Sequence, residues 1–424
     1  MKAGGIFAER SKLTKSPGLM QGFKDSRAVV DFFWFLAAIF FCFLSYSALA
    51  PAAVILRESG LNVAQVGMTL SSAAVPILLA TLVSGFLIAR LGPLSVSVLG
   101  MLVMLVGHAS LNETRSDFPA AMISTTIHGV GLGLLMPAQM VFAKNLIAGP
   151  KGVYYFGIFA SMLQLPNLFG PSLGEHIHAT RGVAGYFLIT AVPLALALGA
   201  VVVLGVLRQA YFKRPPPESA GAALGRRYRD LARDWSVMEP ITAIGLIGFM
   251  YGFAPSYMAL LLADYRLPVA VFFTTFAIFY FGTRFFVFPY LQSIAPSLLA
   301  MAGVLGMTVA YALLVTAVST TTVIAAGVLF GLGYATTYPI LSMWVANQFP
   351  ESERGKPIAL FNAVFMFGIY FFPIFGGFTL SVSGMSTLLA ILCAVGVGTI
   401  LLLGRAPLRR RLADHSTAPG KHTE

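Results

Sequence analysis

Apolar residues dominate the chain in long runs, and short polar segments separate one run from the next. Each run holds about 20 residues, the length that an α-helix needs to cross roughly 30 Å of hydrocarbon. The runs lie near residues 31–55, 64–89, 94–111, 118–143, 153–176, 183–207, 237–263, 269–288, 297–318, 322–346, 357–380 and 385–404. The pattern predicts an all-α membrane protein with 12 transmembrane helices.

The second half of the chain repeats the first. A shift of 202 residues places Gly129 on Gly331, and further pairs align at the same shift without a gap. These pairs are Gly131 and Gly333, Pro137 and Pro339, Asn145 and Asn347, Pro171 and Pro373, and Gly174 and Gly376. A duplication of about 200 residues predicts two six-helix bundles related by a pseudo-two-fold axis.

The repeat and the polar segments divide the chain into five parts. We expect a cytoplasmic tail over 1–28, an N-terminal bundle over 29–208, a cytoplasmic linker over 209–235, a C-terminal bundle over 236–404 and a second cytoplasmic tail over 405–424. After three prolines at 215–217, the linker places apolar residues on one helical face among basic ones: Leu224, Tyr228, Leu231 and Trp235. This spacing predicts a helix lying on the membrane surface.

Composition and charge support this class and orient the protein. The chain is 57% hydrophobic and 10% charged, too few charges to cover a soluble protein of 424 residues. Of the 28 Lys and Arg, 24 fall in the tails and in the even-numbered connections, which predicts that both termini are cytoplasmic. The net charge of +12 therefore reflects topology and anionic lipid headgroups, and we expect no nucleic-acid partner.

The stretch 157–175 carries residues that a simple membrane anchor does not need. Pro166 and Pro171 bend a helix and free backbone groups, while Gly157, Gly170 and Gly174 leave room for a neighbouring backbone. Pro373 and Gly376 repeat the end of the stretch in the second half. We interpret it as a gate or packing face.

Two glycine motifs resemble signatures of the major facilitator superfamily. Gly85, Arg90 and Gly92 match the G-x-x-x-D-R-x-G motif between the second and third helices, with Ala89 in place of the aspartate; a tight turn with one Arg on the inner face explains this stretch equally well. The stretch 157–175 resembles the G-x8-G-x3-G-P-x2-G-G motif of exporters and antiporters. There Gly157, Gly170, Pro171 and Gly174 match, and Pro166 and Glu175 replace two glycines. The resemblance implies two bundles around a central cavity and transport by alternating access.

The fourth predicted helix resembles the family motif R-x-x-Q-G-x-G over residues 125–131. Thr125 stands at the Arg position and His128 at the Gln position. A histidine in a membrane titrates near neutral pH and is costly when charged in lipid. We therefore interpret His128 either as a cavity-lining residue or as a hydrogen-bonded packing residue.

Glu175, His176 and His178 gather near the outer end of the fifth predicted helix. Such a group could relay protons or hold a divalent cation, although a solvated loop rim is the commoner arrangement. Arg284 falls within the eighth predicted helix, where it either lines the cavity or reaches the cytoplasmic interface. Tyr334 belongs to a G-Y-A-T-T-Y-P stretch that resembles exporters of metal-chelating metabolites, as does an E-R-G-K loop at Glu353.

The sequence thus predicts a secondary transporter of a small solute, with export favoured and proton coupling as one option. Among 16 Asp and Glu, only Glu175 lies in or near the body of a span, with Asp31, Glu239 and Asp264 at margins, which favours neutral or anionic solutes, including metal-chelating metabolites. A membrane scaffold or assembly factor that no longer transports is the alternative. We expect a monomer in a bacterial inner membrane, with no enzymatic activity and no cofactor, and no ATP-binding G-x-x-x-x-G-K-[ST] loop is present.

Overall fold

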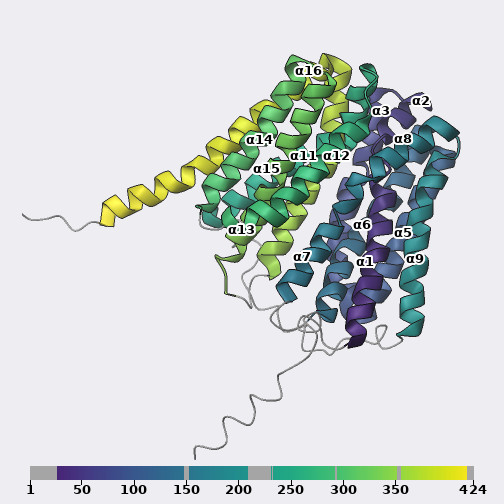
Figure 1. Cartoon of the computed structure of the whole chain (residues 1–424), viewed down its shortest axis with the longest axis horizontal. Helices are drawn as coiled ribbons and strands as arrows, with labels where there is room; N and C mark the ends of the chain where they lie inside the picture. The colour runs from purple at the N-terminus through teal and green to yellow at the C-terminus, as the bar shows by residue number, and fades with distance from the viewer. Residues whose placement is uncertain are drawn as a thin grey trace, which may run out of the picture.

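The computed structural model describes residues 26–147, 152–208, 231, 233–291, 294–350 and 355–417. Helices fill nearly all of these ranges, and no β-strand occurs within them (Figure 1). Residues 1–25 and 418–424 of the expected tails and most of the linker, including Leu224 and Tyr228 of the expected interfacial helix, lie outside the described residues, as does Glu353.

The first half forms one bundle, drawn in purple to teal in Figure 1. Its helices are α1 (Ser26–Ser47), α2 (Ala52–Glu58), α3 (Val63–Ser71), α4 (Ala74–Leu91), α5 (Pro93–Thr114), α6 (Phe118–Leu146), α7 (Gly152–Met162), the 3₁₀ helix η3 (Leu165–Leu168), α8 (Gly170–Arg181) and α9 (Tyr186–Leu207). A core of buried side chains from α1, α5, α6, α7 and α9 holds this bundle together. Phe35 is at its centre, fully buried against Phe142 and Phe159.

The second half forms the other bundle, drawn in green to yellow. Its helices are α11 (Trp235–Asp264), α12 (Val269–Gly282), the π-helix η6 (Thr283–Val287), α13 (Phe288–Leu291), α14 (Pro296–Thr316), α15 (Thr320–Ala346) and α16 (Gly355–Thr417). Its core is richer in aromatic side chains, with Phe253, Phe272, Phe330 and Tyr311 all nearly inaccessible to solvent.

Ten helices within the described residues are long and apolar enough to cross a membrane. Two features account for the difference between these ten helices and the 12 predicted crossings. The apolar part of α16 runs for 49 residues, about two membrane crossings, and reverses at Gly384, whose φ of 79° interrupts the helix. The predicted span 153–176 is divided into α7, η3 and α8, so no single helix there reaches the required length.

The break in this fifth span follows from its prolines and glycines. Pro166 lies in η3 and lacks a backbone N–H, and Pro171 stands in the first turn of α8, where a missing N–H is tolerated. A Cβ on Gly170 would meet the side chain of Ser47, and one on Gly174 would meet the carbonyl oxygen of Ala48. The two glycines therefore let α8 pack closely on the end of α1.

Glycines related by the repeat make equivalent contacts in the two bundles. Gly131 of α6 faces the backbone of Gly100 in α5, and Gly333 of α15 faces the backbone of Gly303 in α14. Gly376 of α16 lies against the ring of Tyr257 in α11, as Gly174 lies against the end of α1. This correspondence is the pseudo-symmetry that the 202-residue shift predicts.

The expectation of a close backbone neighbour is wrong at Gly157, and Gly85 has no such neighbour either. A Cβ added to Gly157 would meet no atom within 4 Å, and the same is true of Gly85. Gly157 lies on a face of α7 that no neighbouring helix covers closely, and Gly85 lies on the wall of a cavity. Matching a motif at these positions therefore does not bring a second backbone near.

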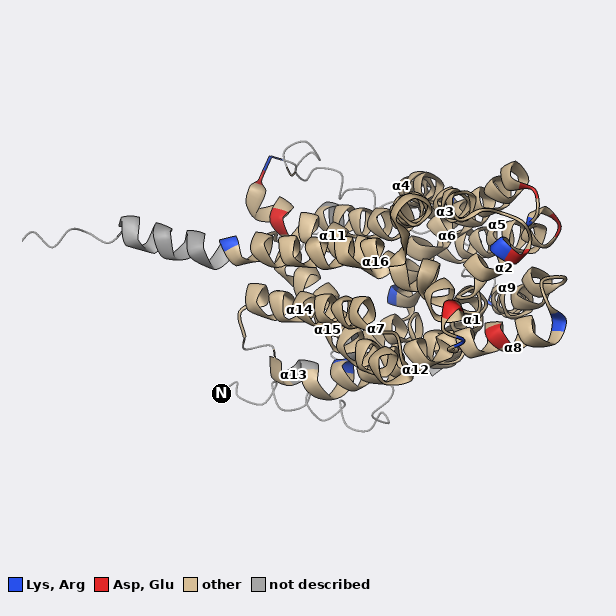
Figure 2. Ribbon diagram, turned by 90° about the horizontal axis from the view of Figure 1, so that it is seen from above, with Lys and Arg blue, Asp and Glu red and all other residues tan. Residues whose placement is uncertain are grey.

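Two carboxylates expected at span margins are buried. Asp31 is 2% exposed and accepts hydrogen bonds of 3.2 and 3.1 Å from Nε of Arg208, which follows α9. Glu239 is 4% exposed in the second turn of α11. Both helices begin before their predicted runs, α1 at Ser26 and α11 at Trp235, so Asp31 and Glu239 lie inside a helix rather than at its first residue. Figure 2 shows how few charged residues lie along the helical body.

Candidate functional site

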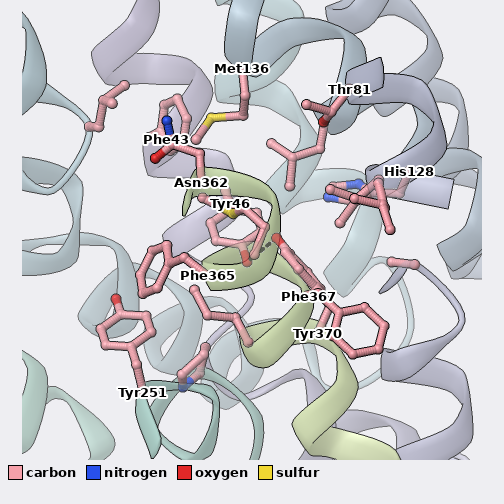
Figure 3. A pocket seen from close by; sticks show the side chains of 18 of the residues that line it. Phe43, Tyr46, Thr81, His128, Met136, Tyr251, Asn362, Phe365, Phe367 and Tyr370 are labelled. Atoms are coloured by element: carbon pink, nitrogen blue, oxygen red, sulfur yellow. Dashed lines mark hydrogen bonds between the residues drawn. The ribbon is translucent and has the colours of Figure 1, made fainter. Parts of the chain in front are cut away.

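A cavity of about 960 Å³ lies between the two bundles. Cavities of this size accommodate drug-sized organic molecules. Both bundles contribute polar side chains to its wall: Tyr46, Ser47, Thr81, Ser84, Thr125, His128, Gln164 and Asn167 from the first, and Tyr251, Ser256, Tyr280, Arg284, Tyr334, Tyr338, Asn362 and Tyr370 from the second. Figure 3 shows several of these side chains directed toward one another.

The bundles meet at one end of the cavity, the end of the molecule where α1 finishes and α12 begins. The backbone N–H of Ile374 in α16 donates a hydrogen bond of 2.6 Å to Oγ of Ser71 in α3. One turn away, a Cβ on Gly67 would meet the carbonyl oxygen of Pro373 and the Cα of Gly377. The hydroxyl of Tyr257 also donates to the Pro373 carbonyl at 2.6 Å, so Pro373 belongs to this contact.

Glu175 links the bundles at the same end. Its carboxylate accepts hydrogen bonds from the backbone N–H groups of Val269 and Ala270, the second at 3.3 Å. These are the first two residues of α12, so the carboxylate caps a helix N-terminus of the other bundle. The α8 helix thereby holds α12 in place.

The three side chains of the weak metal-site candidate do not converge. Glu175 turns toward α12, His178 forms an ion pair of 2.8 Å with Glu58, and His176 is exposed. Among the described residues no group of three or more His, Cys, Asp or Glu is placed to hold a metal ion.

His128 lies on the cavity wall in the middle of α6 (Figure 3). It is 6% exposed, and its ring stacks at 6.2 Å and 20° on the ring of Tyr46. Neither ring nitrogen has a hydrogen-bond partner among the described residues. The backbone of Met104 is a polar neighbour, but it does not meet hydrogen-bond geometry. A buried imidazole without a partner is costly unless a ligand, water or proton satisfies it.

His108 joins His128, a relationship that sequence reasoning missed. The two ring centroids lie 5.7 Å apart at 68°. Nδ1 of His108 lies 3.3 Å from Oγ of Ser45, whose own hydrogen is donated to the carbonyl of Thr190, and Nε2 lies 3.0 Å from Oγ1 of Thr190. The Thr190 hydroxyl also has a carbonyl acceptor of its own, that of Tyr186 at 2.9 Å, so a neutral His108 ring can donate to only one of these two hydroxyls. One signal was available, since both histidines lie among small residues of adjacent apolar runs.

A hydrogen bond across the cavity connects α1 with α16. The hydroxyl oxygens of Tyr46 and Tyr370 lie 2.7 Å apart, as the dashed line in Figure 3 marks. Tyr46 also stacks on His128, so this bond joins the histidine pair to the second bundle. Any relative movement of the bundles has to break or re-form it.

Tyr334 stands at the centre of an aromatic cluster on the wall of the second bundle. Its ring stacks on that of Tyr251 at 4.5 Å and 22°, and the ring of Tyr280 lies 5.8 Å away. Arg284 comes from the π-helix η6 that extends α12, and it lies within electrostatic range of Tyr280 and Tyr334. Arg284 lines the cavity, as one of its two sequence interpretations predicts.

The loop motif at the end of α4 forms the expected tight turn. Gly92 has a φ of 83° and connects α4 directly to α5, which a residue with a Cβ would do at a cost. The guanidinium carbon of Arg90 lies 4.1 Å from the ring centroid of Phe86, a cation–π contact on the same helix.

The fold and the cavity between its halves define the class of this protein, a multi-pass membrane transporter. The sequence profile of the Major Facilitator Superfamily matches residues 35–291 and 269–422, nearly the whole chain, and the chain belongs to that family. No curated protein matches it significantly in sequence.

Solved transporter structures share the fold at low sequence identity. The POT family transporter PepTSo superposes with a TM-score of 0.71 over 91% of this chain and 98% of its own, at 12% identity. A POT family transporter in complex with 5-aminolevulinic acid gives 0.69 over 88% and 95%, at 14% identity. The nucleoside transporter NupG gives 0.70 over 88% and 99%, at 11% identity.

Proposed function

We propose that this protein is a secondary transporter that exports a neutral or anionic organic solute by alternating access. The observation that carries the proposal is the cavity between the bundles, whose described lining contains no Asp or Glu and one Arg. A metal-chelating metabolite would fit these requirements. The structure-sharing transporters named above take small organic solutes, which supports a cargo of that size.

In this proposal residues 29–208 and 236–404 are the two moving bodies, and the linker 209–235 and both tails lie in the cytoplasm. The cavity wall includes Gly85 near the end of α4 and Ile358 near the start of α16, at the end of the molecule where α1 begins, and it also includes Leu56 and Leu111 toward the opposite end. The contacts of Ser71 and Glu175 close the opposite end. With both termini inside, this arrangement is an inward-facing state ready to accept a cytoplasmic solute. We assign the protein to a bacterial inner membrane.

Proton coupling is part of the proposal, with His128 and Glu175 as the groups that bind and release the proton. His128 lines the cavity without a hydrogen-bond partner among the described residues, and Glu175 lies at the contact that must open. Protonation of Glu175 would weaken its cap on α12, because a neutral acid is a poorer acceptor for helix N–H groups. Proton binding and opening are thereby linked.

The test is transport by the purified protein in proteoliposomes. A deletion strain's accumulated metabolites first supply a pool of candidate solutes, and counterflow of each labelled candidate is then measured with and without an imposed pH gradient. Saturable counterflow that an inside-to-outside pH difference can drive uphill is expected. Absence of counterflow for every accumulated metabolite would instead favour the scaffold alternative. That alternative is motivated by Ala89 and Thr125, which stand at positions where the family motifs have charged residues.

A further inference from the structure

We propose that the wall of the second bundle forms a subsite for an organic anion with a flat, conjugated ring, held by Arg284 and the tyrosines around Tyr334. The inference rests on the proposed transport function and names the chemical class of its solute.

Charge is the first argument. Arg284 is the one residue with a permanent charge in the described lining of the cavity. A guanidinium in a membrane-embedded cavity raises the affinity for anions, because the low dielectric of its surroundings strengthens the attraction. Its planar fork of N–H donors matches a carboxylate with two parallel hydrogen bonds. A cationic solute would be repelled by this charge.

The distribution of aromatic side chains is the second argument. Eight aromatic residues of the second bundle line the cavity, against three of the first, Phe43, Tyr46 and Phe187. The eight are Tyr251, Phe273, Tyr280, Tyr334, Tyr338, Phe365, Phe367 and Tyr370. Flat rings offer large stacking surfaces, and the tyrosine hydroxyls add hydrogen-bond donors for an anion. The wall that carries the positive charge is therefore also the wall that favours planar groups.

The internal repeat shows that the fold does not require these aromatic residues. At the 202-residue shift, Tyr334 corresponds to Leu132 and Tyr338 to Met136, and both of these aliphatic residues line the same cavity. At the 203-residue shift that relates Pro93 to Pro296, Arg284 corresponds to Thr81, another lining residue. Equivalent positions thus carry Leu, Met and Thr in the first bundle, whereas the second bundle carries rings and a charge there.

The test uses three matched probes with the purified full chain in nanodiscs. They are 2-naphthoate, its saturated analogue decalin-2-carboxylate, and the cation 2-naphthylmethylammonium, with dissociation constants measured by calorimetry. We expect naphthoate to bind most tightly. Arg284→Gln should weaken naphthoate at least about tenfold, as expected for losing a charged hydrogen-bond partner. Tyr334→Leu, which installs the residue found at the equivalent position, should weaken naphthoate more than decalin-2-carboxylate.

Controls keep the result interpretable. Arg57→Gln removes an exposed positive charge of the first bundle outside the cavity and should leave all three constants unchanged. Arg284→Lys should restore part of the lost affinity, and thermal unfolding of every variant separates lost binding from lost folding. A preference for the cation, equal binding of the two anions, unchanged naphthoate binding in Arg284→Gln, or no binding of any probe would each overturn the inference. Counterflow of some other solute without naphthoate binding would overturn it while leaving the transport function intact.

Discussion

The carboxylate of Glu175 accepts a hydrogen bond of 3.3 Å from the backbone N–H of Ala270, across the boundary between the two bundles. The neighbouring N–H of Val269 donates to the same carboxylate, so one side chain of α8 caps α12. A helix cap of this kind contributes about 0.5–2 kcal/mol. That amount is enough to shift a two-state equilibrium between closed and open forms several-fold.

Glu175→Gln should therefore raise the population that is open at this end. With Ser256→Cys as a reporter in the cavity and Cys42 and Cys393 replaced by serine, labelling by a membrane-impermeant maleimide from the side opposite the termini should become faster. Glu58→Gln is the matched control, because Glu58 pairs with His178 inside the same bundle. Equal labelling rates in the parent and in Glu175→Gln would contradict a role for this cap in closure.

The glycine contacts predict which substitutions the packing tolerates. Gly174→Leu and Gly376→Leu place a branched side chain against the Ala48 carbonyl and the Tyr257 ring, and each should cost about 1–3 kcal/mol or prevent assembly. Gly157→Leu should be tolerated, because its added atoms meet open space. Thermal unfolding in detergent checks all three, and a comparable loss of stability in Gly157→Leu would show that space alone does not decide the outcome.

The ion pair between Asp31 and Arg208 should stabilise the first bundle. Arg208→Gln leaves a carboxylate that is 2% exposed without this partner, whereas Asp31→Asn removes the charge itself. We expect Arg208→Gln to lower the free energy of unfolding by about 1–2 kcal/mol, a value reduced for the partial exposure of the arginine. Asp31→Asn should be milder, because it removes the buried charge together with the pair. A larger loss in Asp31→Asn would refute this account.

Proton coupling predicts a specific loss in the double variant His128→Gln, Glu175→Gln. Charging either group against lipid would cost several kcal/mol, so each has to face water in at least one conformation. The groups facing His128 are His108 and Tyr46, neither of which carries a permanent charge. The double variant should still bind solute yet lose accumulation driven by a pH gradient. If it concentrates solute as well as the parent, coupling through these residues is excluded.

The predicted topology places the linker and the C-terminal tail on one side. Ser219 and Thr417, each replaced by cysteine, should be labelled only from the cytoplasmic side in intact cells and right-side-out vesicles. Labelling of either position from the outside would overturn the orientation derived from the basic residues, and with it the inward-facing assignment.

The sequence by itself determined the class and the plan of this protein. Hydrophobic run length is a one-dimensional property, so it predicts crossings directly, and the 202-residue shift predicts the two bundles because duplicated residues make duplicated contacts. The interruption at Pro166 and the tight turn at Gly92 were also predictable, since proline and glycine act on their own backbone.

Only the tertiary structure decided which polar groups meet. Glu175 is 94 residues from Val269 and Tyr46 is 324 from Tyr370, and no local pattern encodes partners so distant. The histidine pair depends on the relative rotation of α5 and α6, which a sequence of apolar residues without strong amphipathicity leaves open. Gly157 and Gly85 are the converse case, because both match a family motif and yet no neighbouring backbone lies close to either. A glycine permits a close approach, but only the placement of neighbouring helices determines whether one occurs.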